Sequence, residues 1–199
     1  MLIYGDKQDI ENSQNNQCNP TILYCNPNAG YYETLYFDSQ WIEFYTQKGM
    51  NLMLWNYRGY GFSQGNPNPK DIFSDGEIII KYLREEEKLN KIGTHGQSLG
   101  GMISCYLAQK VKLDFLCADR TFSCISDIAY FGFAKWTKFL IKILAKDLDI
   151  WSPKNYSDSN CYKIITYDVN DNIIPYMASL KNGIIKQVSF KIFKIYLKH

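Results

Sequence analysis

Blocks of apolar residues with two different spacings alternate along the chain. Short apolar runs bounded by turn-forming residues, typical of buried strands, occur at residues 21–25, 51–57, 91–94, 115–118 and 162–167. Longer stretches with apolar residues at helical spacing lie between them, at residues 32–48, 70–88 and 102–108. Strands that alternate with helices imply right-handed crossovers. The pattern therefore predicts an α/β fold with a mostly parallel sheet and helices on both faces.

Residues 123–160 interrupt this alternation. Within them, residues 126–146 are strongly apolar with lysines spread among them, and residues 151–160 are polar and read as a linker. After the interruption the pattern predicts a short helix at 174–180 and a last strand at 188–197. We therefore expect one domain over residues 1–199, with a short helical cap-like insertion at about 123–160.

The candidate chemistry centres on residues 96–100, GQSLG, which fit the G-x-S-x-G pattern of a nucleophile elbow. In an elbow, a serine occupies a strained turn between a strand and a helix, and its hydroxyl projects at the edge of the sheet. The pattern alone is weak, since on the order of 0.07 chance matches are expected in a chain of this length. Its position between a predicted strand and a predicted helix strengthens the interpretation of Ser98 as a nucleophile.

A serine nucleophile needs a base, and the chain contains two histidines. His95 lies on the strand that leads into the elbow, where its side chain points into the sheet, so a packed structural histidine is the better interpretation. His199 follows the predicted last strand, the expected topological position for the base of such a triad. It is also the last residue of the chain, and chain ends fray unless they are held in place.

Two aspartates compete for the role of the acid that orients the base. Asp171 follows a predicted strand, at the edge of the sheet where active groups of open α/β sheets collect. Asp119 also ends a strand, but it has the alternative of pairing with Arg120 or capping the next helix. We favour Asp171 because it lies later in the sheet, closer in sequence to His199. Asp168 is interpreted as a turn former.

An oxyanion hole for the acyl transition state requires two preorganised donors. The elbow itself supplies the backbone amide of Leu99. The second amide is expected from the loop after the strand at 21–25, at Asn28 or Ala29. An ordinary turn is the alternative interpretation of that loop.

Composition narrows the remaining possibilities. A net charge of +2 without a basic block gives no reason to expect nucleic acid as a partner. The six cysteines show no C-x-x-C pair and no histidines at metal-ligand spacing, which favours a reducing, cytoplasmic location and no bound metal. The first residues lack the basic start and long apolar core of a signal peptide. No run of 18 apolar residues predicts a transmembrane helix.

Five segments together resemble one family. They are CNPNAGYYE at 25–33, WNYRGYGFSQGNPNP at 55–69, GTHGQSLGG at 93–101, ADRTF at 118–122 and YDVNDNIIP at 167–175. In order and spacing they are similar to α/β-hydrolase-domain serine hydrolases, and above all to the intracellular branch of phosphatidylserine lipases and depalmitoylating thioesterases. The resemblance implies Ser98 as nucleophile, Asp171 as acid, and Leu99 with the Asn28–Ala29 turn as oxyanion hole. It implies no cofactor.

The chain also departs from that family in ways that affect function. Asn26 and Pro27 replace the usual His-Gly of the oxyanion loop, and proline has no amide hydrogen to donate. The strands that usually precede residues 21–25 are short, and nothing follows His199. We therefore expect a chain that is shortened at both ends.

The expected function is a serine hydrolase that cleaves a carboxylic ester or thioester, such as an acyl lipid or an acylated protein, through an acyl-enzyme. The aromatic and basic residues of the insertion are compatible with peripheral contact with a membrane, but packing of the apolar side over the sheet is the preferred interpretation. The alternative is an inactive α/β-hydrolase-like module, either for binding or for membrane docking, that lacks a working histidine.

Overall fold

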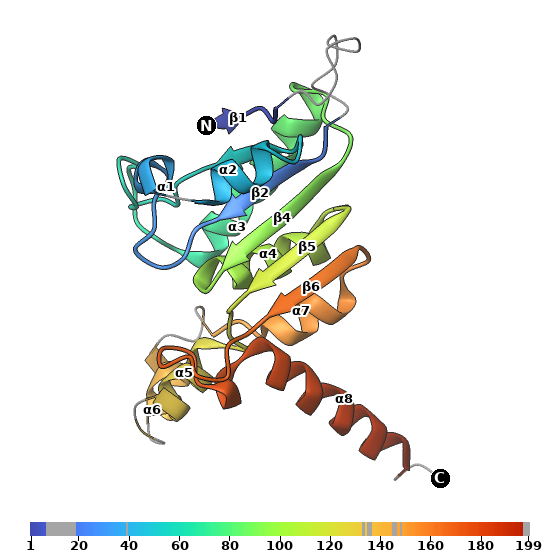
Figure 1. The fold of residues 1–199 in the computed structure, drawn as a ribbon. Helices are drawn as coiled ribbons and strands as arrows, with labels where there is room; N and C mark the ends of the chain where they lie inside the picture. The colour runs from blue at the N-terminus through green and yellow to red at the C-terminus, as the bar shows by residue number, and fades with distance from the viewer. Residues whose placement is uncertain are drawn as a thin grey trace.

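The computed structural model describes residues 1–6, 19–38, 40–132, 134, 137–144, 147 and 149–196. Their centre is a six-stranded sheet of order β1-β3-β2-β4-β5-β6. The strands are β1 (Leu2–Ile3), β2 (Thr21–Cys25), β3 (Asn51–Leu54), β4 (Ile92–Gln97), β5 (Phe115–Asp119) and β6 (Tyr162–Thr166). All neighbouring strands are parallel except β1 and β3 (Figure 1). The predicted parallel sheet is therefore confirmed.

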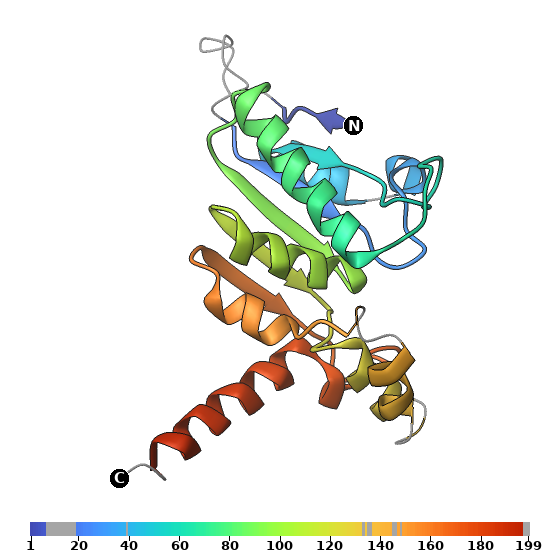
Figure 2. The same ribbon diagram turned by 180° about the vertical axis from the view of Figure 1, so that it is seen from behind.

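One face of the sheet is closed by helices. These are α3 (Pro69–Glu85), α4 (Leu99–Lys110) and α7 (Ser152–Asp158), which lie side by side on the face seen in Figure 2. The main hydrophobic core lies beneath them, where Leu107 of α4 and Leu116 of β5 are fully buried. We call this the closed face.

The opposite face carries α1 (Tyr32–Asp38) and α2 (Gln40–Thr46), seen in front of the sheet in Figure 1. A smaller core lies between them and the strands, formed by Tyr45 of α2 with Ile22, Tyr24, Leu52 and Leu54 of β2 and β3. Helices thus cover the β2–β3 half of this face. On β6 the same face is uncovered, with Tyr162 85% and Ile164 50% exposed. We call this the open face.

Residues of the expected cap form two helices beside the carboxyl ends of β5 and β6. They are α5 (Ile125–Gly132) and α6 (Thr137–Leu144), and they contact each other (Figure 1). A buried hydrogen bond joins Ser123 Oγ to Asp127, and the ammonium of Lys138 on α6 pairs with the same carboxylate. The apolar block predicted as one long stretch is therefore a helical pair held partly by a buried acid.

Two predictions for the second half of the chain were wrong. Residues 151–160 were interpreted as a linker, but α7 begins there at Ser152, with Pro153 in its first turn and both residues buried. Proline is well suited to the first turn, because a backbone amide there has no hydrogen-bond partner within the helix. The polar composition of this segment led to the prediction of a linker, whereas the helix packs on α4.

Of the predicted last strand at 188–197, residues 188–196 instead belong to a helix, α8 (Leu180–Tyr196), which follows a single 3₁₀ turn, η4 (Tyr176–Ala178). Residue 197 lies outside the described residues. Ser179 starts α8 because its Oγ accepts a hydrogen bond from the amide of Asn182 at 3.2 Å. No proline interrupts the segment that follows, so the helix continues through β-branched residues that otherwise favour strands. Similarly, the helix predicted over 32–48 is two helices, α1 and α2.

Candidate active site at the carboxyl edge of the sheet

Ser98 lies between β4 and α4 with φ +52° and ψ −114°. Residues other than glycine rarely adopt this backbone conformation. The neighbouring glycines make this turn possible. A Cβ on Gly96 would lie 2.0 Å from the carbonyl oxygen of Gly100, and a Cβ on Gly100 would lie 1.9 Å from that of Cys25. The strand, the strained turn and the helix expected for a nucleophile elbow are thus present.

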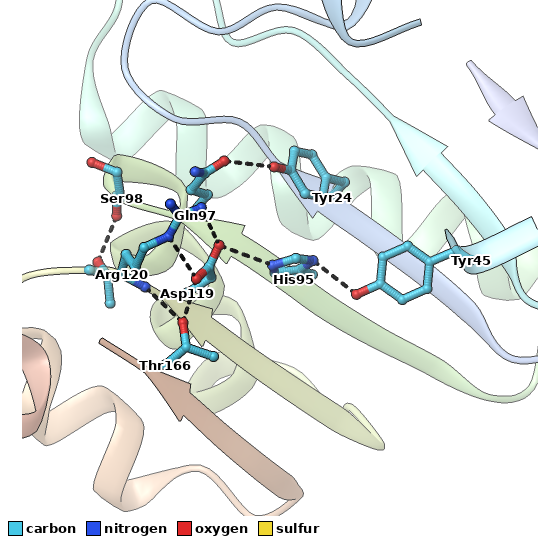
Figure 3. Close-up of polar contacts among 9 residues, drawn as sticks. Tyr24, Tyr45, His95, Gln97, Ser98, Asp119, Arg120 and Thr166 are labelled. Carbon is cyan, nitrogen blue, oxygen red and sulfur yellow. Dashed lines mark hydrogen bonds and ion pairs between the residues drawn. The ribbon is translucent and has the colours of Figure 1, made fainter. Parts of the chain in front are cut away.

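Backbone contacts fix the turn on both sides of Ser98. Its amide donates to the carbonyl of Asp119 at 3.0 Å, and its carbonyl accepts from Thr121 Oγ1 at 2.6 Å. The residue is partly exposed, and its hydroxyl points away from the neighbouring polar side chains in Figure 3. Within the described parts of the chain, no hydrogen bond to that hydroxyl is present. The oxygen is therefore held at the surface, away from the polar side chains that surround the turn.

The loop that follows β2 packs against the first turn of α4. The carbonyl oxygens of Cys25 and Asn26 approach Gly100 most closely. Beyond them a turn closes with a hydrogen bond from the amide of Gly30 to the carbonyl of Pro27 at 3.0 Å. Asn28 and Ala29 form the middle of this turn, and Ala29 has φ +61°. The loop that was expected to supply an oxyanion donor therefore begins beside the elbow.

Asp171 lies in the loop after β6, as expected. Its Oδ1 accepts hydrogen bonds from the amides of Ile173 at 2.8 Å and Ile174 at 2.9 Å. These bonds fix the carboxylate on a turn, and no hydrogen bond to Oδ2 is present within the residues that the structure describes. Asp168 is exposed and accepts a bond from the amide of Asn170, which is the turn role predicted for it.

The rival acid, Asp119, is already engaged with its neighbours. Arg120 donates to both of its carboxylate oxygens, at 3.1 and 3.2 Å, and Thr166 donates from the adjacent strand (Figure 3). Burial alone would raise the pKa of Asp119, but contacts with His95, Arg120 and Thr166 outweigh it and hold this pKa well below its usual range. Asp119 therefore stays charged at neutral pH and anchors the edge of the sheet.

His95 is buried on the open face, with 1% of its surface exposed. Its Nδ1 is 2.9 Å from the hydroxyl of Tyr45, and its Nε2 is 3.8 Å from Asp119 Oδ2. The ring also packs edge-on against Tyr24 and Trp41. Since one ring nitrogen is hydrogen-bonded to Tyr45 of α2 and the other faces Asp119 of β5, the packed structural histidine favoured from the sequence agrees with this geometry.

His199 lies outside the described residues. The reasoning that led to it needs correction, because it assumed a final strand where α8 is found. Figure 1 shows α8 running away from the carboxyl edge of the sheet and past β6. The role of His199 as base thus stays a prediction without the topological argument that suggested it.

Sequence reasoning missed the polar network that links Tyr45, His95, Asp119, Arg120 and Thr166 across α2, β4, β5 and β6 (Figure 3). The signal that would have found it is the sheet register, which pairs Asp119 with Thr166 and His95 with Cys117. No cluster of three or more metal-ligating side chains occurs in the part of the chain that the structure describes. No described helix is long and apolar enough to cross a membrane.

The sheet, its crossovers and the elbow define the α/β-hydrolase fold. Among solved structures, an esterase from Pyrococcus furiosus, Pf2001, matches with a TM-score of 0.68 at 16% identity, covering 85% of this chain and 67% of that one. The chain belongs to the family described as Chlamydia CHLPS protein (DUF818), which matches residues 6–183.

Two longer proteins are among its relatives. "Uncharacterized membrane protein YNL320W" of Saccharomyces cerevisiae is 32% identical over 139 residues, covering 67% of this chain and 46% of that protein. "Lysophosphatidylserine lipase ABHD12" of Danio rerio is 24% identical over 180 residues, covering 81% of this chain and 46% of that protein. The chain thus spans less than half the length of either relative.

Proposed function

We propose that this protein is a serine hydrolase that cleaves a carboxylic ester or thioester through an acyl-enzyme, with Ser98 as nucleophile. The observation that carries the proposal is the strained backbone of Ser98 on a turn built by Gly96 and Gly100. Strain of this kind costs on the order of 1–3 kcal/mol and persists where the surrounding structure enforces it, commonly at active sites.

In the proposed reaction, Ser98 Oγ attacks the acyl carbon and the ester oxygen or thioester sulfur leaves with a proton. The negative charge that develops on the acyl oxygen is stabilised by the amide of Leu99 and by that of Asn28 or Ala29. Leu99 is the first residue of α4, so the positive end of the helix dipole supports the same charge. Water then attacks the acyl-enzyme and regenerates the serine.

The remaining members of the triad are proposed on different grounds. Asp171 has one carboxylate oxygen fixed by two amides, which leaves the other oriented for an imidazole. His199 is proposed as that imidazole from the sequence alone. It would accept the proton of Ser98 and return it to the leaving group, while Asp171 stabilises the imidazolium.

The proposed substrate is a long-chain acyl lipid or an acylated protein. Support comes from the relative named as a lysophosphatidylserine lipase. A cavity of about 550 Å³ between the cap helices and α8 has a mixed lining, with Tyr130, Phe131 and Trp151 beside charged side chains such as Asp127 and Lys142. Phe139 of α6 is 68% exposed, and this residue supports the proposal of peripheral membrane contact from the cytoplasmic side.

A fluorophosphonate probe tests the nucleophile directly. The wild-type protein is expected to become labelled covalently, and Ser98→Ala is expected to lose all labelling. Ser104→Ala serves as the matched control, because Ser104 is a fully buried serine on α4, the helix that follows Ser98, and its replacement should leave labelling intact. Labelling of Ser98→Ala at the wild-type rate would remove Ser98 from the role.

A second candidate function is an inactive module that binds an acyl group without cleaving it. It is favoured by the burial of His95, the one imidazole that the described residues include. Replacement of His199 by Ala separates the two candidates. An active enzyme that uses His199 loses hydrolysis of a p-nitrophenyl ester by about 10⁴-fold or more. A wild-type protein that shows no hydrolysis supports the inactive module, and unchanged hydrolysis in the variant identifies another base.

A further inference from the structure

The open face contains an apolar groove that the proposed chemistry does not use. It has a volume of about 460 Å³ and lies over β4, β5 and β6, next to α2. Trp41 and Phe44 of α2 form one wall, and Phe115, Cys117 and Ile164 extend the apolar surface across the strands. A volume and lining of this kind are typical of sites for small organic ligands.

The groove ends in a cationic mouth at the amino edge of the sheet. Lys48 follows α2, Lys91 precedes β4, and both line the groove and are exposed. The Lys48 ammonium lies 5.0 Å from the centre of the Phe44 ring. Neither lysine forms an ion pair with any residue that the structure describes. Asp114 is the one acid among the described residues that line the groove, and its Oδ2 accepts a hydrogen bond from the amide of Ile92 at 2.9 Å.

From this combination we infer that the groove binds a monomeric long-chain fatty acid as its carboxylate. The chain would lie over Phe115 and Ile164, and the carboxylate would lie between the ammonium groups of Lys48 and Lys91. Burial of the chain removes apolar surface from water, and the two lysines complement the charge of the head. A neutral or cationic amphiphile lacks this second contribution.

This site is separate from the elbow. Ser98 lies at the carboxyl ends of the parallel strands, whereas Lys91 lies at their amino ends, one residue before Ile92. A fatty acid held there is out of reach of the nucleophile. The inference therefore does not depend on the proposed hydrolase activity and can fail or succeed without it.

The test is a binding titration of the wild-type chain with oleate below its micelle concentration, followed by displacement of a fluorescent fatty acid. One saturable site is expected. Ile164→Glu places a charge in the groove from an edge strand and should weaken binding at least tenfold. Its matched control is Ile78→Glu, a 61% exposed isoleucine on the outer side of α3, which should bind as the wild type does.

The head group is tested separately. Lys48→Glu combined with Lys91→Glu should weaken oleate binding about tenfold or more, and should leave binding of oleyl alcohol within about twofold. Lys81→Glu, on the exposed side of α3, is the matched control. Oleate binding that is insensitive to Ile164→Glu overturns the inference. So does a dimer that Ile164→Glu dissociates, because a second copy of the chain would then occupy the groove.

Discussion

The two faces of the sheet are built from the same strands but are buried to very different degrees. On the closed face, Leu107 and Leu116 have no exposed surface, and α3, α4 and α7 form a continuous layer. On the open face, cover extends over β2 and β3 but stops before β6, where Ile164 is half exposed. Since alternate residues of a strand point to opposite faces, a single five-residue strand can contribute to both environments.

The difference assigns different tasks to the faces. Stability resides on the closed face, because hydrophobic stabilisation scales with the apolar area removed from water. The elbow is attached to that face through α4, so the nucleophile is positioned by the most rigid layer. The open face carries the polar network and the groove, and it buries less apolar surface.

The largest expected effect comes from Gly100→Ala. Its new Cβ would lie 1.9 Å from the carbonyl oxygen of Cys25 and 2.7 Å from that of Asn26, and both are backbone atoms that cannot move aside. We expect a loss of more than about 4 kcal/mol in the free energy of unfolding, together with loss of fluorophosphonate labelling. Gly132→Ala is the control, because no atom lies within 4 Å of a Cβ there. Equal urea midpoints for both variants would contradict the described elbow.

A core deletion compares the faces directly. Leu107→Ala on the closed face should lower the free energy of unfolding by about 2–5 kcal/mol, because it leaves a cavity in the main core. Ile164→Ala on the open face should change it by about 1 kcal/mol or less, because half of that side chain is already in water. Urea unfolding measures both, and similar losses would show that something covers the open face in solution.

Asp119→Asn tests the network on the open face. The pKa of this carboxyl is lowered in the folded state, so folding favours its charged form. Its contribution is present above the unfolded pKa of about 3.9 and is lost as the pH falls through the folded value. We expect the free energy of unfolding of the variant to be lower than that of the wild type by on the order of 2 kcal/mol at pH 7. The gap from wild type should narrow as the pH falls below about 4.

The control for this measurement is Asp168→Asn, since Asp168 is exposed and accepts a hydrogen bond that an asparagine side chain also accepts. The free energy of unfolding of Asp168→Asn should stay within about 0.5 kcal/mol of the wild-type value at every pH. A gap for Asp119→Asn that stays constant between pH 7 and pH 3 would indicate that steric fit, and not charge, is what Asp119 supplies.

Much of the fold was readable from the sequence because parallel strands buried on both faces have a simple pattern. The apolar run at residues 21–25 matches β2, which is buried along its whole length. The run at 162–167 matches β6, although one face of that strand is exposed. Local patterns failed where tertiary contacts decide the outcome. The segment that forms α7 is polar because its core-facing residues are few, and the second half of α8 has strand-forming residues without a partner strand.

The site was readable in part. The elbow needs Gly96 and Gly100 at fixed spacing around Ser98, so its geometry is written into consecutive residues. The engagement of Asp119 was not readable, because Thr166 lies 47 positions further along the chain and meets it only through the register of β5 and β6. The base could not be placed, because the expectation for His199 rested on a strand that does not form.

The left-handed backbone at residue 98 also provides a way to sort the members of this family. Glycine accepts that conformation without strain, so a chain released from selection for chemistry gains about 1 kcal/mol by replacing the serine with glycine. Stability alone therefore favours glycine over serine at this position. Serine at this position in a homologue indicates that the hydroxyl is retained at a cost in stability. Glycine there indicates a homologue that has lost the nucleophile.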